Sequence, residues 1–160
     1  MTPDGRRASL AGYRDRPLVL IFYPGDFTPV CTGELGLFNE LMPDLQGLGA
    51  SVLGISCDSL WSHCAYAREL KLGMALLSDF HLKGAASRRY EVYRDDVGTS
   101  ERALIVVDGD GIIFWSEVSP IELNPGADGV LDALERLSGR EVRPGSTVRE
   151  VPRAQPEVRR

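Results

Sequence analysis

The stretch LVLIFYPGDFTPVC, residues 18–31, joins an apolar segment to a single thiol through a short turn. Leu18 to Tyr23 is continuously apolar and rich in strand formers, which is typical of a strand buried on both faces of a sheet. Thr28 is a favourable N-cap residue and Pro29 suits the first helical position, so we expect a helix to begin here. Cys31 then falls in the first helical turn, where unpaired N–H groups and the helix dipole favour a negative charge. Since the thiolate is the nucleophilic form of cysteine, Cys31 is a candidate for chemistry.

The segments after Cys31 predict a parallel pair of strands. A helix is expected from Pro29 to about Gln46, followed by a second apolar strand from Ser51 to Cys57. Strand, helix and strand in this order form a βαβ unit. The other expected elements are a helix from about Leu60 to Leu72 with Asp58 or Ser59 as cap and an end near Gly73, a short strand Ala75–Leu77, a helix His81–Tyr90, a hairpin of Arg102–Val107 and Ile112–Val118 around the turn Asp108–Gly111, and a helix from about Ala127 to Leu137 that Gly139 ends.

These elements predict an α/β protein of the thioredoxin-like order. Its mixed central sheet has a parallel βαβ part and a later antiparallel hairpin, and helices flank the sheet. The chain has 160 residues, of which 43% are hydrophobic, enough for a single core. We expect residues 1–139 to form this domain and residues 140–160, rich in charge, Pro and Gly, to be a flexible tail.

Charge argues against two classes of partner. The net charge of −5 disfavours a nucleic-acid groove or an anionic membrane surface as the main partner. No apolar run approaches the roughly 18 to 20 residues that span a bilayer, and no secretion signal is evident at the start. We therefore expect a cytoplasmic protein.

The cysteines point to a reactive thiol. Cys31, Cys57 and Cys64 are an odd number without a CxxC pair, which disfavours both a disulfide framework and a zinc knuckle. His63 and His81 do not complete a convincing metal site, so no metal is expected. A reactive or redox-active cysteine is the interpretation that remains.

Pro24, Thr28 and Cys31 together fit the pattern P-x-x-x-T-x-x-C, set within FYPGDFTPVCTGEL. In this motif the chain resembles the peroxiredoxins. It looks closest to the peroxiredoxin Q group, also called bacterioferritin comigratory proteins, or to the one-cysteine alkyl hydroperoxide reductase E group. The resemblance continues through residues 52–79, the strand that carries Arg102, and residues 124–137. It implies a thioredoxin-fold thiol peroxidase that reduces hydrogen peroxide or organic hydroperoxides without a cofactor.

The resemblance also implies roles for single residues. Cys31 would be the peroxidatic cysteine, with the Thr28 hydroxyl beside the attacked oxygen and Pro24 shielding the sulfur. Arg102 would stabilise the thiolate and help to hold the substrate, and Glu34, about one helical turn after Cys31, would orient Arg102. From the residues alone, a charge at the solvent edge of a strand is the favoured interpretation of Arg102. For Glu34, an ordinary exposed helix residue is as good an interpretation as a role in the site.

A sulfenic acid on Cys31 must be resolved by a second thiol. Peroxiredoxin Q proteins often carry that thiol five residues after the peroxidatic one, where this chain has Gly36. Some similar proteins carry it instead on the helix after the second strand, so the resemblance favours Cys64 as the resolving residue. Its use would require the first turn around Cys31 to unwind. Cys57 could lie near Cys31 at the same end of the sheet, although a packing role is favoured for it. Otherwise an external thiol attacks Cys31 directly.

The expected partners are a hydroperoxide and thioredoxin or another thiol reductant, and the chain would be a monomer or a homodimer. A thioredoxin-like disulfide oxidoreductase is disfavoured because Cys31-Thr32-Gly33-Glu34 lacks the second thiol of CxxC. A non-catalytic interaction module, using the tail or the helix that carries Trp61, is a further alternative. The family pattern usually has more residues before Thr2, so we expect a shortened N-terminal hairpin.

Overall fold

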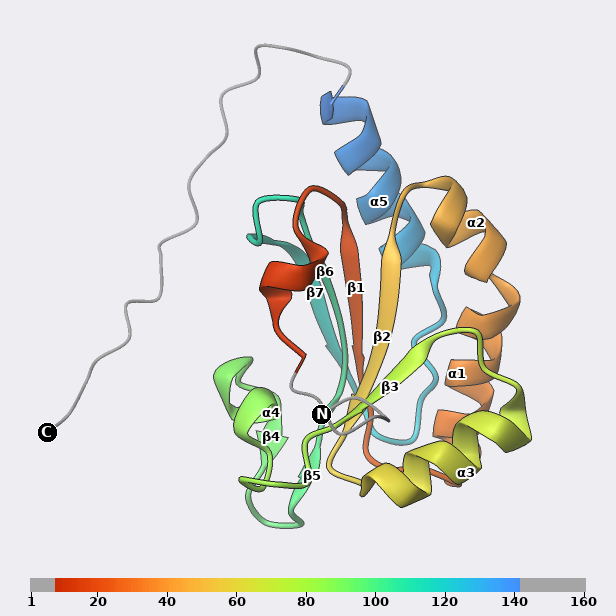
Figure 1. Ribbon diagram of the computed structural model, residues 1–160, viewed down its shortest axis with the longest axis vertical. Helices are drawn as coiled ribbons and strands as arrows, with labels where there is room; N and C mark the ends of the chain where they lie inside the picture. Colours follow the sequence, from red (N-terminus) through yellow and green to blue (C-terminus); the bar gives the residue numbers. More distant parts are fainter. Residues whose placement is uncertain (1–7, 142–160) are drawn as a thin grey trace, which may run out of the picture.

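A mixed sheet forms the centre of the computed structural model, which describes residues 8–141 (Figure 1). The strands of this sheet are β1 (Leu18–Phe22), β2 (Ser51–Ser56), β3 (Ala75–Ser78), β6 (Arg102–Val107) and β7 (Ile113–Ser119). Their order is β3-β2-β1-β6-β7. The first three run parallel, whereas β6 pairs antiparallel with both β1 and β7. A separate small ribbon consists of β4 (Tyr93–Arg94) and β5 (Thr99–Ser100).

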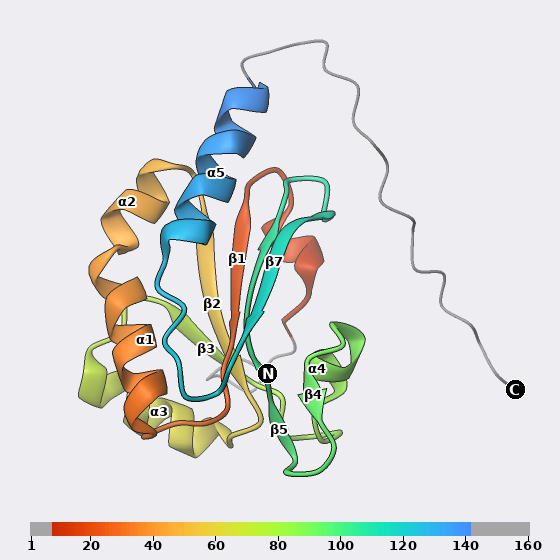
Figure 2. The same ribbon diagram turned by 180° about the vertical axis from the view of Figure 1, so that it is seen from behind.

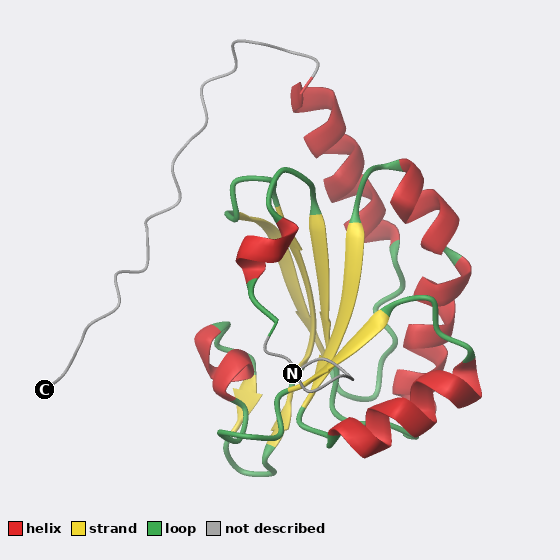
Figure 3. Ribbon diagram, viewed as in Figure 1, coloured by secondary structure: helices red, strands yellow, loops and turns green. Residues whose placement is uncertain are grey.

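Helices cover both faces of the sheet, as the secondary-structure colouring of Figure 3 shows. They are the 3₁₀-helix η1 (Leu10–Tyr13) and the α-helices α1 (Pro29–Glu40), α2 (Met42–Gly47), α3 (Leu60–Leu70), α4 (Ala85–Arg89) and α5 (Asp128–Glu141). Seen from behind in Figure 2, α1, α2 and α5 lie on one side of the sheet, and η1 and α4 lie on the other. We call these the α1 side and the α4 side. This is the predicted thioredoxin-like arrangement.

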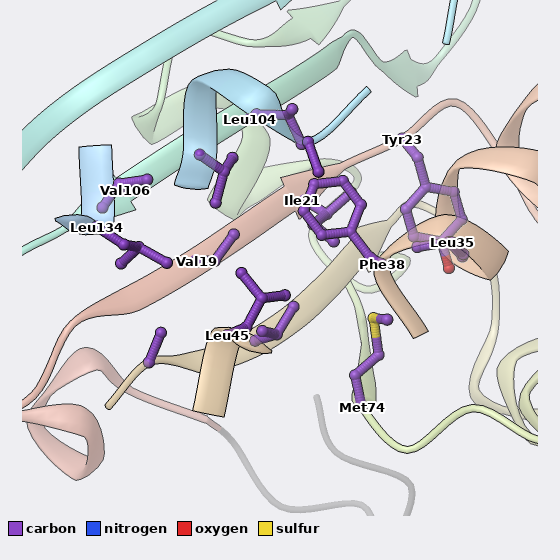
Figure 4. Packing of buried hydrophobic residues seen from close by; sticks show 14 of the residues in the cluster. Val19, Ile21, Tyr23, Leu35, Phe38, Leu45, Met74, Leu104, Val106 and Leu134 are labelled. Atoms are coloured by element: carbon purple, nitrogen blue, oxygen red, sulfur yellow. The ribbon is translucent and has the colours of Figure 1, made fainter. Parts of the chain in front are cut away.

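Alternation along β1 divides the core between the two sides. Val19, Ile21 and Tyr23 face the α1 side, where they pack with Leu35, Phe38 and other residues shown in Figure 4. Leu18, Leu20 and Phe22 face the α4 side. Every residue of β1 is buried, because this strand is central and covered on both faces. The sequence prediction of a strand buried on both faces is therefore confirmed.

The predicted helix from Pro29 to Gln46 is two helices. The first, α1, ends at Glu40, and α2 begins at Met42 with Pro43 in its first turn. A proline lacks an N–H and clashes with the carbonyl four residues earlier, so it interrupts a helix unless it lies in the first turn. The prediction overlooked this proline.

The helices α4 and α3 also differ from the prediction. The expected helix His81–Tyr90 is only Ala85–Arg89, because Leu82, Lys83 and Gly84 have positive φ angles. In α3, Ser59 is the cap, since its side chain accepts the Ser62 N–H. The helix ends at Leu70, two residues earlier than expected, and left-handed Lys71 is its C-cap.

The predicted hairpin is present, with a small shift in its second strand. Arg102–Val107 is confirmed as a strand, and its partner begins one residue later than expected, at Ile113. The Asp108 side chain accepts the N–H groups of Asp110 and Ile112, which closes the turn. The last helix runs to Glu141, past Gly139. The rest of the expected tail, and the expected shortened N-terminal hairpin, fall on residues outside the described range 8–141.

Candidate active site

The turn after β1 delivers Cys31 into the first turn of α1. Thr28 has the extended backbone of an N-cap residue and Pro29 occupies the first helical position, as predicted. The first hydrogen bond of the helix runs from the Thr32 N–H to the Thr28 carbonyl, at 2.9 Å. The N–H groups of Val30 and Cys31 precede that bond, so the helix offers them no acceptor. The thiol therefore belongs to the end of the helix that carries free backbone donors and the positive end of the helix dipole.

The side chain of Thr28 does not cap the helix, which corrects the prediction. Its hydroxyl donates instead to the carbonyl of Gly25, at 3.1 Å, and no side-chain cap bond forms. The hydroxyl is turned back into the turn because that carbonyl lies within reach. Thr28 itself is exposed at the surface.

Arg102 lies directly against the sulfur of Cys31. Its Nη2 donates to Cys31 Sγ at 3.5 Å, and both side chains are almost completely buried. The sheet explains this contact. Phe22 pairs with Ala103 across the antiparallel strands, so Arg102 lies one step further, at the level where β1 leads into the turn. The interpretation of Arg102 as a charge at the solvent edge is therefore wrong.

Further bonds fix the guanidinium. The carbonyl of Ile121 accepts from Nε at 3.1 Å and from Nη2 at 2.8 Å. The Glu34 Oε2 atom accepts from Nη1. Glu34 is fully buried, because residues three apart on a helix share a face and Cys31 faces the core. The exposed alternative for Glu34 is thus wrong.

Glu34 has an unusual electrostatic environment. Burial raises its pKa to about 7, since the loss of solvation outweighs the opposing attraction and hydrogen bond of Arg102. Its second oxygen, Oε1, is buried without a hydrogen-bond partner in the described part of the chain. The Arg102 guanidinium is therefore shared between a carboxyl group with raised pKa and the Cys31 thiol.

The sheet separates Cys57 from Cys31. Cys57 follows β2 on the α4 side, with its sulfur 3.8 Å from the Ser100 hydroxyl, whereas Cys31 packs on the α1 side. Burial raises the pKa of the Cys57 thiol. The expectation that Cys57 could lie near Cys31 is wrong, because consecutive strand residues point to opposite faces and Ser56, not Cys57, points to the α1 side.

Cys64 lies on α3, as predicted, and is half-buried; all three cysteines are free thiols. Its neighbours on the helix, His63 and Tyr66, contact the turn and helix start around Cys31. The Tyr66 hydroxyl lies 2.9 Å from the Thr32 hydroxyl, and its ring packs on Phe27 with ring centres 4.8 Å apart. Cys64 is thus placed on the element that packs against the Cys31 turn.

Sequence reasoning missed a buried polar cluster beneath this turn. His63 Nδ1 lies 2.9 Å from Asp26 Oδ2, and the Tyr23 hydroxyl donates to Asp26 Oδ1 at 2.8 Å. A signal was available, because His63 and Tyr66 are three apart and must share the apolar face of their helix. The sequence does not show that Asp26 faces the same helix.

A groove of about 910 Å³ lies away from Cys31 and Arg102. Residues from η1, the start of α3, the segment before α4 and α4 with its C-cap line it, among them Trp61, Phe80 and Tyr90. The contact of Arg102 with the Cys31 thiol, and not this groove, therefore marks the candidate site.

Comparison with known proteins decides the family. The chain matches the AhpC/TSA family over residues 1–116. It belongs to that family. A peroxiredoxin 2 of Thermoplasma acidophilum is 32% identical to this member over 133 residues, covering 81% of this chain and 67% of the relative. The chain spans about two thirds of the length of the curated relatives that it matches.

Solved structures of AhpC/TSA proteins share the fold. AhpC of Enterococcus faecalis has a TM-score of 0.81 at 27% identity, covering 90% of this chain and 87% of that chain. Peroxiredoxin Q of Xanthomonas campestris has a TM-score of 0.75 at 30% identity, with 85% and 88% covered. The resemblance to peroxiredoxins and the thioredoxin-like fold are both confirmed. Within residues 8–141, no helix is both long enough and apolar enough to cross a membrane.

Proposed function

We propose that this AhpC/TSA protein is a thiol peroxidase and that Cys31 is its nucleophile. The observation that carries the proposal is the contact of Arg102 Nη2 with Cys31 Sγ, at 3.5 Å, in the first turn of α1. A guanidinium and a helix N-terminus both favour the thiolate over the thiol. The same donors can stabilise negative charge on a departing oxygen. The site therefore suits attack by sulfur on a peroxide.

The proposed first step balances as a two-electron transfer. The Cys31 thiolate attacks the terminal oxygen of a hydroperoxide, an S–O bond forms and the O–O bond breaks. The departing alkoxide, or hydroxide from hydrogen peroxide, takes a proton and leaves as alcohol or water. The sulfur is oxidised to sulfenic acid and the peroxide is reduced. Arg102 and the N–H groups of Val30 and Cys31 are the donors that would stabilise the leaving oxygen.

Three further residues support this step in the proposal. Pro24 and Thr28 border the turn, where Pro24 would shield the sulfur and the Thr28 hydroxyl would meet the attacked oxygen. Glu34 holds the Nη1 edge of Arg102, which leaves Nη2 for the sulfur. Glu34 therefore acts through Arg102 and is a positioning residue.

We propose Cys64 as the resolving residue. Its thiol would attack the Cys31 sulfenic acid, forming a disulfide and releasing water, and a dithiol reductant of the thioredoxin type would then reduce the disulfide. The fully buried Cys31 must leave its place for this, because a disulfide requires its two Cα atoms to approach within about 7 Å. Cys64 is favoured over Cys57 because α3, which carries Cys64, packs against the Cys31 turn. Cys57 lies across the sheet. Direct attack by an external thiol is the alternative.

A disulfide oxidoreductase fits the site less well. Glu34 occupies the place where a CxxC motif would have its second thiol, and it is bonded to Arg102. A buried carboxyl group at that position cannot form a disulfide with Cys31. The geometry therefore favours peroxide chemistry over dithiol exchange.

The test is peroxide consumption with dithiothreitol as reductant. We expect Cys31→Ser to abolish consumption above the uncatalysed background, while Cys57→Ser, the matched cysteine control, keeps the wild-type rate. Full activity in Cys31→Ser would reject the proposal. Insulin reduction, run in parallel, should stay at background, and strong activity in that assay would favour the oxidoreductase instead.

A further inference from the structure

A buried pair, Asp26 and His63, joins the Cys31 turn to α3. His63 Nδ1 lies 3.1 Å from Oδ1 and 2.9 Å from Oδ2 of Asp26, and each side chain is 1% exposed. An aspartate carboxylate only accepts, so a hydrogen bond between the two requires the proton on Nδ1. Buried polar groups of this kind are stable only when paired, and the turn cannot move away from α3 without separating them.

Asp26 is also held from two other elements. The Tyr23 hydroxyl, at the end of β1, donates to its side chain at 2.8 Å. Its backbone N–H donates to Asp58 Oδ2, just after β2, at 2.9 Å. The turn is therefore fixed at Asp26 by β1, by the end of β2 and by α3.

The backbone next to Asp26 shows how tightly the turn is determined. Phe27 has a φ of +60°, in the left-handed region that bulky residues rarely adopt. Such a conformation persists only where the surroundings enforce it. Here the pairing of Asp26 on one side and the packing of Phe27 on Tyr66 on the other do so.

We infer that Asp26 and His63 form a positioning pair that holds the Cys31 thiolate in register with its hydrogen-bond donors. The inference rests on the proposed function, because it names what keeps that nucleophile in place. Arg102 approaches Cys31 from the β6 side, and the pair fixes the turn from the α3 side. His63 acts through Asp26 and does not itself bond to the sulfur in the described structure. Neither residue belongs to the P-x-x-x-T-x-x-C pattern of Pro24, Thr28 and Cys31.

Two reactions of Cys31 distinguish positioning from simple stabilisation. Reduction of hydrogen peroxide needs the sulfur aligned with Arg102 and the backbone donors, so it is sensitive to small displacements. Alkylation by iodoacetamide needs only an accessible thiolate. Loss of positioning therefore lowers the rate of the peroxide reaction but not the rate of alkylation. Loss of folded protein instead lowers the fraction of protein that reacts in the native manner in both reactions.

The variants are His63→Leu, His63→Asn and the double variant Asp26→Asn/His63→Leu. Asn keeps an N–H donor close to the place of Nδ1, so it should rescue most of the effect. The double variant removes the imidazole and the carboxylate charge together, so no buried carboxylate loses its histidine partner if His63→Leu alone fails to fold. Ser87→Ala is the matched control, because Ser87 is also fully buried and bonded to an aspartate, Asp79, but lies on the α4 side.

Stopped-flow measurement of Cys31 oxidation should show a fall of about tenfold or more for His63→Leu and for the double variant. The rate should stay within about threefold of wild type for His63→Asn and Ser87→Ala, and alkylation should not slow by more than about threefold in any variant. Unchanged peroxide rates in folded His63→Leu or in the double variant would overturn the inference, as would an equal fall in Ser87→Ala. If wild type itself shows no rapid Cys31 oxidation, the proposed function fails instead.

Discussion

Arg102 bridges two side chains of one helix, because its Nη2 bonds to the sulfur of Cys31 and its Nη1 to the carboxyl of Glu34. Cys31 and Glu34 are three residues apart on α1, so both present their side chains to the same strand end. The guanidinium can serve both because it carries several donors in one rigid plane. One residue of β6 thus joins the thiol and the buried carboxyl group of the site.

Replacing Arg102 by Gln should slow the reaction of Cys31 with hydrogen peroxide by about 100-fold, the usual cost of losing one donor to a developing anion. Arg102→Lys should recover part of the rate, because it keeps a charge but loses the planar fork. The double variant Arg102→Gln/Glu34→Gln is the folding control, since no buried carboxyl group is left without its partner. A wild-type oxidation rate in folded Arg102→Gln would contradict the role of Arg102.

Glu34 should make stability depend on pH. Its pKa is about 7 in the folded protein and near 4.5 when unfolded, so the folded state binds more protons between these values. Stability then falls as the pH rises through this window. Glu34→Gln mimics the protonated form and lacks this pH dependence. The difference in free energy of unfolding, variant minus wild type, should therefore be larger at pH 7.5 than at pH 5. Urea unfolding at both pH values measures this, and a relative fall would show that Arg102 instead lowers the pKa.

Thr28 should matter for chemistry more than for folding. Its hydroxyl makes no cap bond, so Thr28→Val should change the free energy of unfolding by less than about 1 kcal/mol, the usual worth of a cap. We expect the same variant to slow peroxide reduction by about tenfold or more, with Thr28→Ser close to wild type. Stopped-flow rates and urea unfolding separate the two effects. If Thr28→Val lost much stability and kept full activity, Thr28 would be a structural residue and not part of the chemistry.

The resolving step predicts a specific disulfide. After one equivalent of hydrogen peroxide, non-reducing peptide mapping should find Cys31 joined to Cys64 in wild type and in Cys57→Ser. Cys64→Ser should form no such bond and should accumulate sulfinic acid on Cys31 when more peroxide is added. Disulfide formation between Cys31 and Cys57 would be incompatible with their placement on opposite sides of the sheet. Absence of any internal disulfide in wild type would favour the one-cysteine cycle.

The sequence was informative where one local signal decided the structure. The apolar run from Leu18 predicted a central strand, and Thr28 with Pro29 predicted the start of the helix that carries Cys31. Both signals depend only on neighbouring residues. The helix break at Pro43 was equally local and was overlooked.

Contacts between distant residues could not be predicted in the same way. From the residues alone, Arg102 reads as a strand-edge charge, and the family resemblance was needed to predict it beside Cys31. The antiparallel register with β1 is the physical reason that it lies there. The role of Glu34 follows from its bond to Arg102, so it could not be predicted before Arg102 was placed. The pairing of Asp26 with His63 joins segments 37 residues apart, and no pattern within either segment encodes it. Tertiary placement therefore decides which polar residues are buried in the site.

The most direct measurement is to locate the first oxygen transferred from peroxide. Wild-type protein is mixed with one equivalent of hydrogen peroxide in the presence of dimedone, which traps sulfenic acid, and the modified peptides are identified by mass spectrometry. We predict that the label appears on Cys31 within the first turnover and not on Cys57 or Cys64. A label on another cysteine, with Cys31 still reduced, would contradict the central claim.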